Sequence, residues 1–195
     1  CLPAFLISIG VSYGKKTETK RNKIQEWIMN NNIYSTQFMK GFQGGDGCKI
    51  RWDKTLDKRN NKEGHIIKIQ ETSQQVNYLF KNDLKEFMEQ CITILKKLKI
   101  DVTSETIKET IISSNRIKYS FTISSKSTNL INYYDKIGYS YCESKNNTSF
   151  VTVEYLKYKL FNKITKTNGN NNDKLMNIEE WNKLIENKNK CIFVP

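Results

Sequence analysis

Histidine, paired cysteines and nucleotide-binding glycine loops are the clearest absences from this sequence. His65 is the only histidine among the 195 residues, which argues against an HNH nuclease, a Ser-His-Asp triad and a histidine-based zinc site. Neither a G-x-x-x-x-G-K-[ST] phosphate loop nor a G-x-G-x-x-G dinucleotide fingerprint occurs. The five cysteines never form a C-x-x-C pair, so neither a zinc cluster nor a disulfide framework is indicated, and we expect buried free thiols.

A long apolar run is also missing. No stretch approaches the length of a membrane span, and the first apolar segment, CLPAFLISIGV, lacks a basic leader and a small-residue cleavage site. We therefore expect an intracellular protein, in the cytoplasm or nucleus, with no membrane partner.

Acidic residues are outnumbered by basic ones. The chain carries 32 Lys and Arg against 20 Asp and Glu, a net charge of +12, which makes nucleic acid or an anionic surface the leading class of partner. A generally basic protein without such a partner is the alternative. The length suffices for one domain with a hydrophobic core, or for one and a half repeats of a small fold.

Periodicity along the chain predicts alternating helices and strand pairs. We expect a short helix over 36–44 with Ser35 or Thr36 as its N-cap, and an amphipathic helix over 76–98, where apolar residues recur at helical spacing. The other predicted elements are strands over 48–54, 65–72, 102–112 and 116–124, and helices over 128–137 and 149–164. Because helices and antiparallel strands segregate in this order, the sequence predicts an α+β fold.

The segment FMKGFQGGDG, residues 38–47, is the most informative part of the chain. Its glycines Gly41, Gly44 and Gly45 should each weaken an isolated helix by about 1 kcal/mol relative to alanine. A glycine on a helix face lets a second helix approach closely, so this helix could pack against a twin and deliver the Asp46 carboxylate to a shared site. The alternative is a tight turn into a hairpin.

Residues Met39 to Gly47, MKGFQGGDG, resemble the LAGLIDADG signature of homing endonucleases, in the GF-x-GGDG form of inteins and related mobile elements. The resemblance implies that Gly41, Phe42 and Gly44 belong to the packing helix, that Asp46 and the Gly45 backbone bind metal, and that Gly47 closes the helix. The stretches LINYYDKIGYSYCESK and VEYLKYK resemble the far end of such domains, and IEEWNKLIENKNKCIFVP resembles the connection to an intein's splicing domain.

This resemblance implies an αββαββα half-domain with an antiparallel DNA-binding sheet. Residues 1–34 would be the tail of a preceding half-domain, 35–165 the endonuclease half-domain, 166–176 a polar linker, and 177–195 a C-terminal helix leading to a following domain. No second motif occurs in the chain. We therefore favour a missing first half-domain in the same chain, with a homodimer as the alternative.

The implied activity is site-specific cleavage of both strands of DNA. Phosphodiester hydrolysis requires an activated water and a stabilised leaving oxygen, and Mg²⁺ or another divalent cation held by one Asp from each of two helices would supply both. Other interpretations stay open. The chain could be a catalytically inactive nucleic-acid-binding relative, such as an RNA-splicing maturase or a decayed intein endonuclease, or it could only pack against a splicing domain.

Strand alternation predicts a basic, hydrogen-bonding sheet face for double-stranded DNA. An ordinary solvated face is the alternative for any one residue. Because relatives use a basic residue and polar strand residues near the metal, the resemblance suggests Lys118 or Lys68 for charge stabilisation and Gln70 for ordering water. The candidate DNA-binding residues are Lys49, Arg51, Lys68, Gln70, Thr72, Arg116, Lys118, Ser120 and Thr122.

Overall fold

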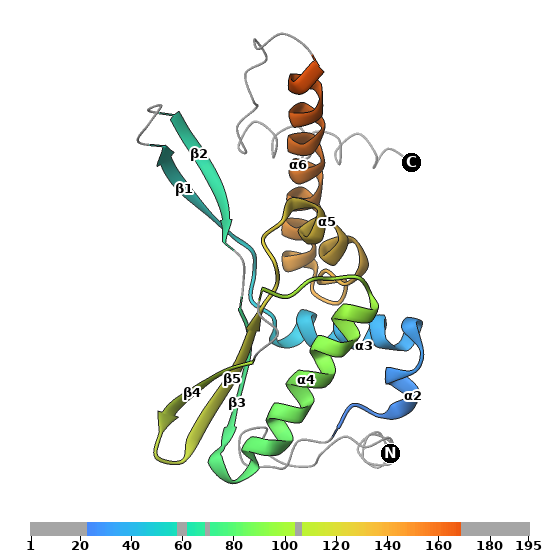
Figure 1. Ribbon diagram of the computed structural model, residues 1–195, viewed down its shortest axis with the longest axis vertical. Coiled ribbons are helices and arrows are strands. Elements are labelled where there is room, and N and C mark those ends of the chain that lie inside the picture. The colour runs from blue at the N-terminus through green and yellow to red at the C-terminus, as the bar shows by residue number, and fades with distance from the viewer. Residues whose placement is uncertain (1–22, 58–61, 69–70, 104–106, 169–195) are drawn as a thin grey trace.

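The structure is a computed structural model that describes residues 23–57, 62–68, 71–103 and 107–168. A three-stranded antiparallel sheet with one helix packed across its inner face forms the lower half of the molecule in Figure 1. Its strands β3 (Glu71–Asn77), β5 (Arg116–Thr122) and β4 (Lys108–Ser113) lie in that spatial order. The inner side chains of β5 are buried under helix α4 (Lys81–Lys97). The outer side chains of β5 alternate with them: Arg116, Lys118, Ser120 and Thr122.

A separate hairpin extends away from this sheet, in the same direction as the long C-terminal helix (Figure 1). It consists of β1 (Arg51–Asp57) and β2 (Lys62–Lys68), paired antiparallel from Arg51 opposite Lys68 to Asp57 opposite Lys62. Only residues 69 and 70 separate β2 from β3.

Helix α3 (Asn32–Asp46) carries the glycine motif and follows the short helix α2 (Glu26–Met29). The Asn31 side chain caps α3 by accepting from the backbone N–H groups of Ile33 and Tyr34. The Ser35 hydroxyl instead donates to the carbonyl of Ile28 at 2.6 Å and so ties the two helices together.

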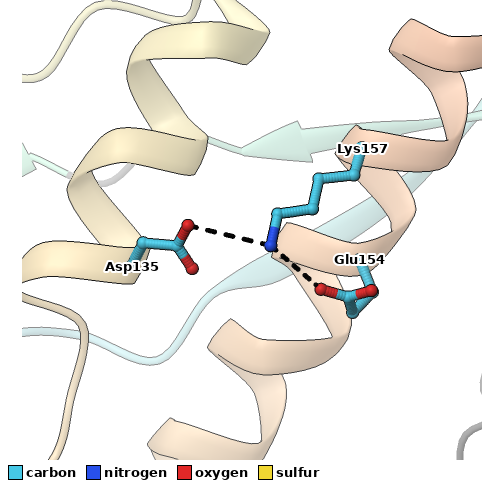
Figure 2. A network of polar contacts seen from close by, with 3 residues as sticks. All are labelled: Asp135, Glu154 and Lys157. Carbon is cyan, nitrogen blue, oxygen red and sulfur yellow. Dashed lines mark hydrogen bonds and ion pairs between the residues drawn. The ribbon is translucent and has the colours of Figure 1, made fainter.

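Helices α5 (Ser127–Lys136) and α6 (Glu143–Asn168) pack against each other and against the remaining core. Three tyrosines, Tyr133, Tyr134 and Tyr139, are buried there and belong to the core. On the surface, Lys157 of α6 lies 3.7 Å from Asp135 and 3.2 Å from Glu154 (Figure 2). These exposed pairs stabilise the fold by about 1 kcal/mol at most.

The mixture of helices with antiparallel strands confirms the α+β class, but several predicted boundaries were wrong. The motif helix begins four residues earlier than predicted, because Asn31 rather than Ser35 or Thr36 caps it. The predicted strand over 65–72 is two strands. The predicted helix over 76–98 begins only at Lys81, after a 3₁₀ turn over Tyr78–Phe80, because Val76 is a buried strand residue paired with Ile117.

Two later boundaries also differ. Within the strand predicted over 102–112, the described residues form β4 and an isolated bridge between Val102 and Ile123, while 104–106 lie outside the described residues. Helix α6 is longer than predicted at both ends and runs into the predicted linker. Most of the predicted tail over 1–34 and all of the C-terminal helix over 177–195 lie outside the described residues. Across the part of the chain that the structure describes, no helix is long and apolar enough to span a membrane.

Candidate active site at the end of helix α3

Asp46 is the last residue of helix α3, and Gly47 ends the helix in an extended conformation with φ −69° and ψ 145°. The Gly47 N–H still donates to the carbonyl of Gln43 at 2.9 Å. A Cβ atom at position 47 would collide with the Gln43 carbonyl and side chain, so this turn requires glycine. The local sequence therefore fixes an exposed carboxylate at a helix end.

Two glutamines connect this end of α3 to strand β3. Gln43 is buried and donates from Nε2 to the hydroxyl of Thr72 at 3.1 Å. Gln74 donates from Nε2 to Oδ2 of Asp46, also at 3.1 Å. The structure thus places Gln74 against the acid, whereas the predicted water-ordering residue, Gln70, lies outside the described residues.

Asp46 borders an open hollow of about 310 Å³, lined also by Ser73, Gln74, Gln75 and Lys118. The structure therefore brings together two of the predicted catalytic residues, Asp46 and Lys118. The Lys118 ammonium is paired with Glu71 at 3.1 Å. The pKa of Glu71 lies below its usual range, because the Ser120 hydroxyl and the Lys118 ammonium stabilise its carboxylate. The hollow combines an acid, amides, a hydroxyl and an ammonium, a set that can bind a phosphate and a cation together.

Lys145 also contacts this end of α3, and sequence reasoning missed it. Its ammonium donates to the carbonyls of Gly44 at 2.9 Å, Gly45 at 3.4 Å and Gly47 at 2.7 Å. These carbonyls flank Asp46 in the chain. One feature of the sequence could have identified Lys145: it is the last residue of the stretch LINYYDKIGYSYCESK, which resembles the far end of endonuclease domains.

The motif glycines of α3 have unequal surroundings. Among the described residues, a Cβ atom at Gly41 or Gly45 would meet nothing within 4 Å, whereas one at Gly44 would lie 3.4 Å from the Cβ of Tyr141. The tyrosine hydroxyl also donates to Oε1 of Gln37 at 2.7 Å. Gly44, which the motif resemblance places in the packing helix, is therefore covered by Tyr141 of the same chain.

Phe42 also packs within the chain. Its ring lies 5.5 Å from the ring of Phe87 on α4 and 6.4 Å from that of Phe38. What remains open on α3 is a row of exposed residues at four-residue spacing, which we call the open row: Ile33, Gln37, Gly41 and Gly45.

The structure places some residues of the predicted DNA face on the outer side of the sheet and others elsewhere. Thr72 pairs with Phe121 and is buried, so it lies on the inner face. Ser120 is on the outer face but only 1% exposed. Strand β3 instead presents Glu71, Ser73, Gln75 and Asn77, the partners of Thr122, Ser120, Lys118 and Arg116.

The remaining candidate DNA-binding residues lie at the base of the hairpin. Lys49 and Arg51 are exposed, as predicted. Lys68 is the strand partner of Arg51. The basic candidates therefore do not share one sheet. Arg51 and Lys68 belong to the two-stranded sheet, whereas Arg116 and Lys118 belong to the three-stranded sheet.

The described residues fit only half of a divalent metal site. Among residues 23–57, 62–68, 71–103 and 107–168, no group of three or more His, Cys, Asp or Glu side chains could hold a metal ion. The Gly45 carbonyl, predicted as a backbone ligand, accepts from Lys145. Because Mg²⁺ is commonly held by one or two carboxylates plus substrate phosphates, Asp46 is a fitting ligand that needs a second acid from elsewhere.

No family model, curated protein or solved structure matches this chain significantly.

Proposed function

We propose that this chain is one half of a LAGLIDADG-type, metal-dependent DNA endonuclease, whose active site is completed by a second motif helix. The observation that carries the proposal is the position of Asp46. It is an exposed acid at the end of a glycine-bearing helix and borders a polar hollow with Gln74 and Lys118. The motif resemblance of residues 39–47 agrees with this geometry.

The open row on α3 supports a helical partner. No residue in the described part of the chain would touch a Cβ at Gly41 or Gly45, so a second helix can approach this face to near backbone contact. If the second helix lies beside α3 with the same direction, the two C-terminal ends bring two Asp carboxylates together. The partner is a second half-domain, supplied either by a preceding segment of the same protein or by another copy of this chain.

Exposed apolar residues at the other end of α3 agree with that arrangement. Ile33 is 69% exposed, and Trp27 and Tyr34 are 55% and 50% exposed, with their rings in edge contact at 5.4 Å. A twin helix in the same direction would cover this end as well. Apolar clusters that are open in one half and buried in the whole are typical of permanent interfaces.

The chemistry of the reaction assigns separate roles to the residues around the hollow. When bound, a divalent cation would polarise the scissile phosphate and activate the attacking water. Asp46 would hold the cation, the Gln74 amide would orient the carboxylate and a nearby water, and Lys118 would attract the phosphate. The outer face of the sheet and the net charge of +12 supply a surface for the DNA backbone.

The first prediction concerns Asp46. We expect Asp46→Asn to abolish Mg²⁺-dependent cleavage of a randomised duplex DNA library, because the amide cannot hold the cation, while leaving the fold unchanged. Asp135→Asn is the matched control, since it neutralises an exposed acid on α5 that forms an ion pair with the surface lysine Lys157. Sequencing of cleaved ends measures both variants.

The outcomes separate the endonuclease from its rivals. The assay is run on the chain alone at high concentration and after fusion to a second copy. If cleavage by the fused protein persists in Asp46→Asn, the catalytic assignment is wrong. If the fused wild-type protein cleaves no DNA but binds RNA in preference to DNA without metal, the chain is a nucleic-acid-binding relative instead.

A further inference from the structure

Lys145 is at the wrong end of its own helix for its charge. It lies in the first turn of α6 (Glu143–Asn168), where the helix dipole presents its positive pole and disfavours a cation. Its backbone N–H is used in that turn, donating to the carbonyl of Cys142 at 3.1 Å. The position therefore weakens α6, and the side chain must have its favourable interactions outside that helix.

Those interactions are with the C-terminal end of α3. The last carbonyls of an α-helix have no donor from within the helix, and the Lys145 ammonium reaches those of Gly44 and Gly45, as well as that of Gly47 beyond the end. A cation also favours the negative pole of the α3 dipole. The contact joins residues that are 98 to 101 positions apart in the sequence, so it is a tertiary cap.

The segment that Lys145 caps is intrinsically the least constrained part of α3. Gly44, Gly45 and Gly47 surround Asp46, and glycine permits the widest range of backbone angles. Tyr141 packs on Gly44 from the same segment as Lys145, and Gln74 contacts the Asp46 carboxylate from β3. The direction of the carboxylate is thus fixed by contacts from other elements rather than by its own helix.

We propose that Lys145 is a positioning residue that holds the glycine-rich end of α3 and thereby aims the Asp46 carboxylate at its cation. This inference rests on the proposed function for the identity of the cation. It concerns the backbone on either side of the acid, so it can be tested without DNA cleavage.

The test compares Lys145→Met, which keeps the stem but removes the ammonium, with Lys145→Arg, which keeps donors and charge. Lys157→Met on the same helix is the matched control, because its ammonium contacts only exposed carboxylates in Figure 2. The full chain is used, with Mn²⁺ as the probe. Two quantities are measured by NMR: amide hydrogen exchange of Gly45 to Cys48, and the Mn²⁺ concentration that half-broadens those amide signals.

We expect Lys145→Met to weaken Mn²⁺ binding by about tenfold, as loss of a residue that orients a metal ligand commonly does, and to raise amide exchange at Gly45 to Cys48. Lys145→Arg and Lys157→Met should stay close to wild type. The direction of the change in Mn²⁺ affinity is decisive. Removal of a nearby positive charge would, by Coulomb's law alone, strengthen Mn²⁺ binding rather than weaken it. Stronger or unchanged binding in a folded Lys145→Met chain overturns the proposal.

Two further outcomes keep the proposals apart. If Lys145→Met does not fold, Lys145→Arg decides: wild-type exchange and Mn²⁺ binding support the positioning role, and loss of both while the fold is retained overturns it. If the wild-type protein cleaves no DNA in the endonuclease assay but Lys145→Met shows the expected changes, the positioning role stands and the endonuclease proposal fails.

Discussion

Single polar residues connect separate elements of this fold in addition to the apolar core. Asn129 at the start of α5 is 6% exposed and makes hydrogen bonds to two other segments. Its Oδ1 accepts from the backbone N–H of Asp101 at 2.7 Å, and its Nδ2 donates to the carbonyls of Asp101 and Ser124, each at 3.0 Å. One amide thus joins the two chain segments that flank the β4–β5 hairpin to helix α5.

The residue-scale prediction concerns this amide. We expect Asn129→Asp to lower the free energy of unfolding by about 1–3 kcal/mol, because a carboxylate keeps the acceptor but loses both donors and leaves buried carbonyls unsatisfied. Urea unfolding followed by circular dichroism measures the change. Asn132→Asp, whose donors reach the exposed end of α4, should have a smaller effect, and equal effects would contradict the role of burial.

At the scale of elements, the two sides of α3 have different surroundings. One side is used within the chain, where Phe42 contacts Phe87 and Gly44 contacts Tyr141. The other side is the open row, where a Cβ atom at Gly41 or Gly45 would meet no described residue within 4 Å. Glycine weakens a helix, and no contact among the described residues requires glycine at position 41. We therefore propose that a helical partner is the reason for glycine at this position.

The element-scale prediction follows from this conflict between stability and pairing. We expect Gly41→Ala to stabilise the isolated chain by about 1 kcal/mol, since alanine is the better helix former and its Cβ meets no described residue within 4 Å. The same change should weaken pairing of the fused halves and their cleavage of DNA. Thermal unfolding and sedimentation of the chain and its fusion measure the two effects, and Lys40→Ala on α3 is the control. Unchanged pairing in Gly41→Leu, which is bulkier still, would contradict the role of the open row.

At the scale of the whole molecule, positive charge is the property most relevant to a partner. The net charge of +12 predicts attraction to polyanions whatever the details of the site. The structure shows where part of this charge lies. Arg116 and Lys118 are on the outer face of the sheet, while α4 covers its inner face. Glu71, paired with Lys118 on the same outer face, reduces the charge there.

The molecule-scale prediction is a salt dependence. We expect Arg116→Gln to reduce the slope of log affinity for duplex DNA against log salt concentration by about one, as loss of one phosphate contact does. Lys85→Gln is the control, because Lys85 is an exposed residue of α4, on the other side of the sheet. Fluorescence anisotropy over a range of salt concentrations measures both slopes. Equal slopes for the two variants would mean that DNA does not use this face.

The sequence by itself determined those features that depend on neighbours along the chain. The glycine-rich segment placed Asp46 at a helix end, helical spacing identified the core face of α4, and alternation in Arg116–Thr122 separated the inner and outer faces of β5. Helical and strand periodicity act over a few residues, so a local pattern is sufficient to predict them.

Only the tertiary structure decided what surrounds Asp46. The pairing of β3 with β5 places Thr72 opposite the buried Phe121, and strand register sets which face of a sheet each side chain occupies. Thr72 consequently lies inside, and Gln74 contacts the acid. Lys145 reaches the same helix end from about 100 positions away. No local pattern specifies such a contact, because it depends on how α3, β3 and α6 pack together.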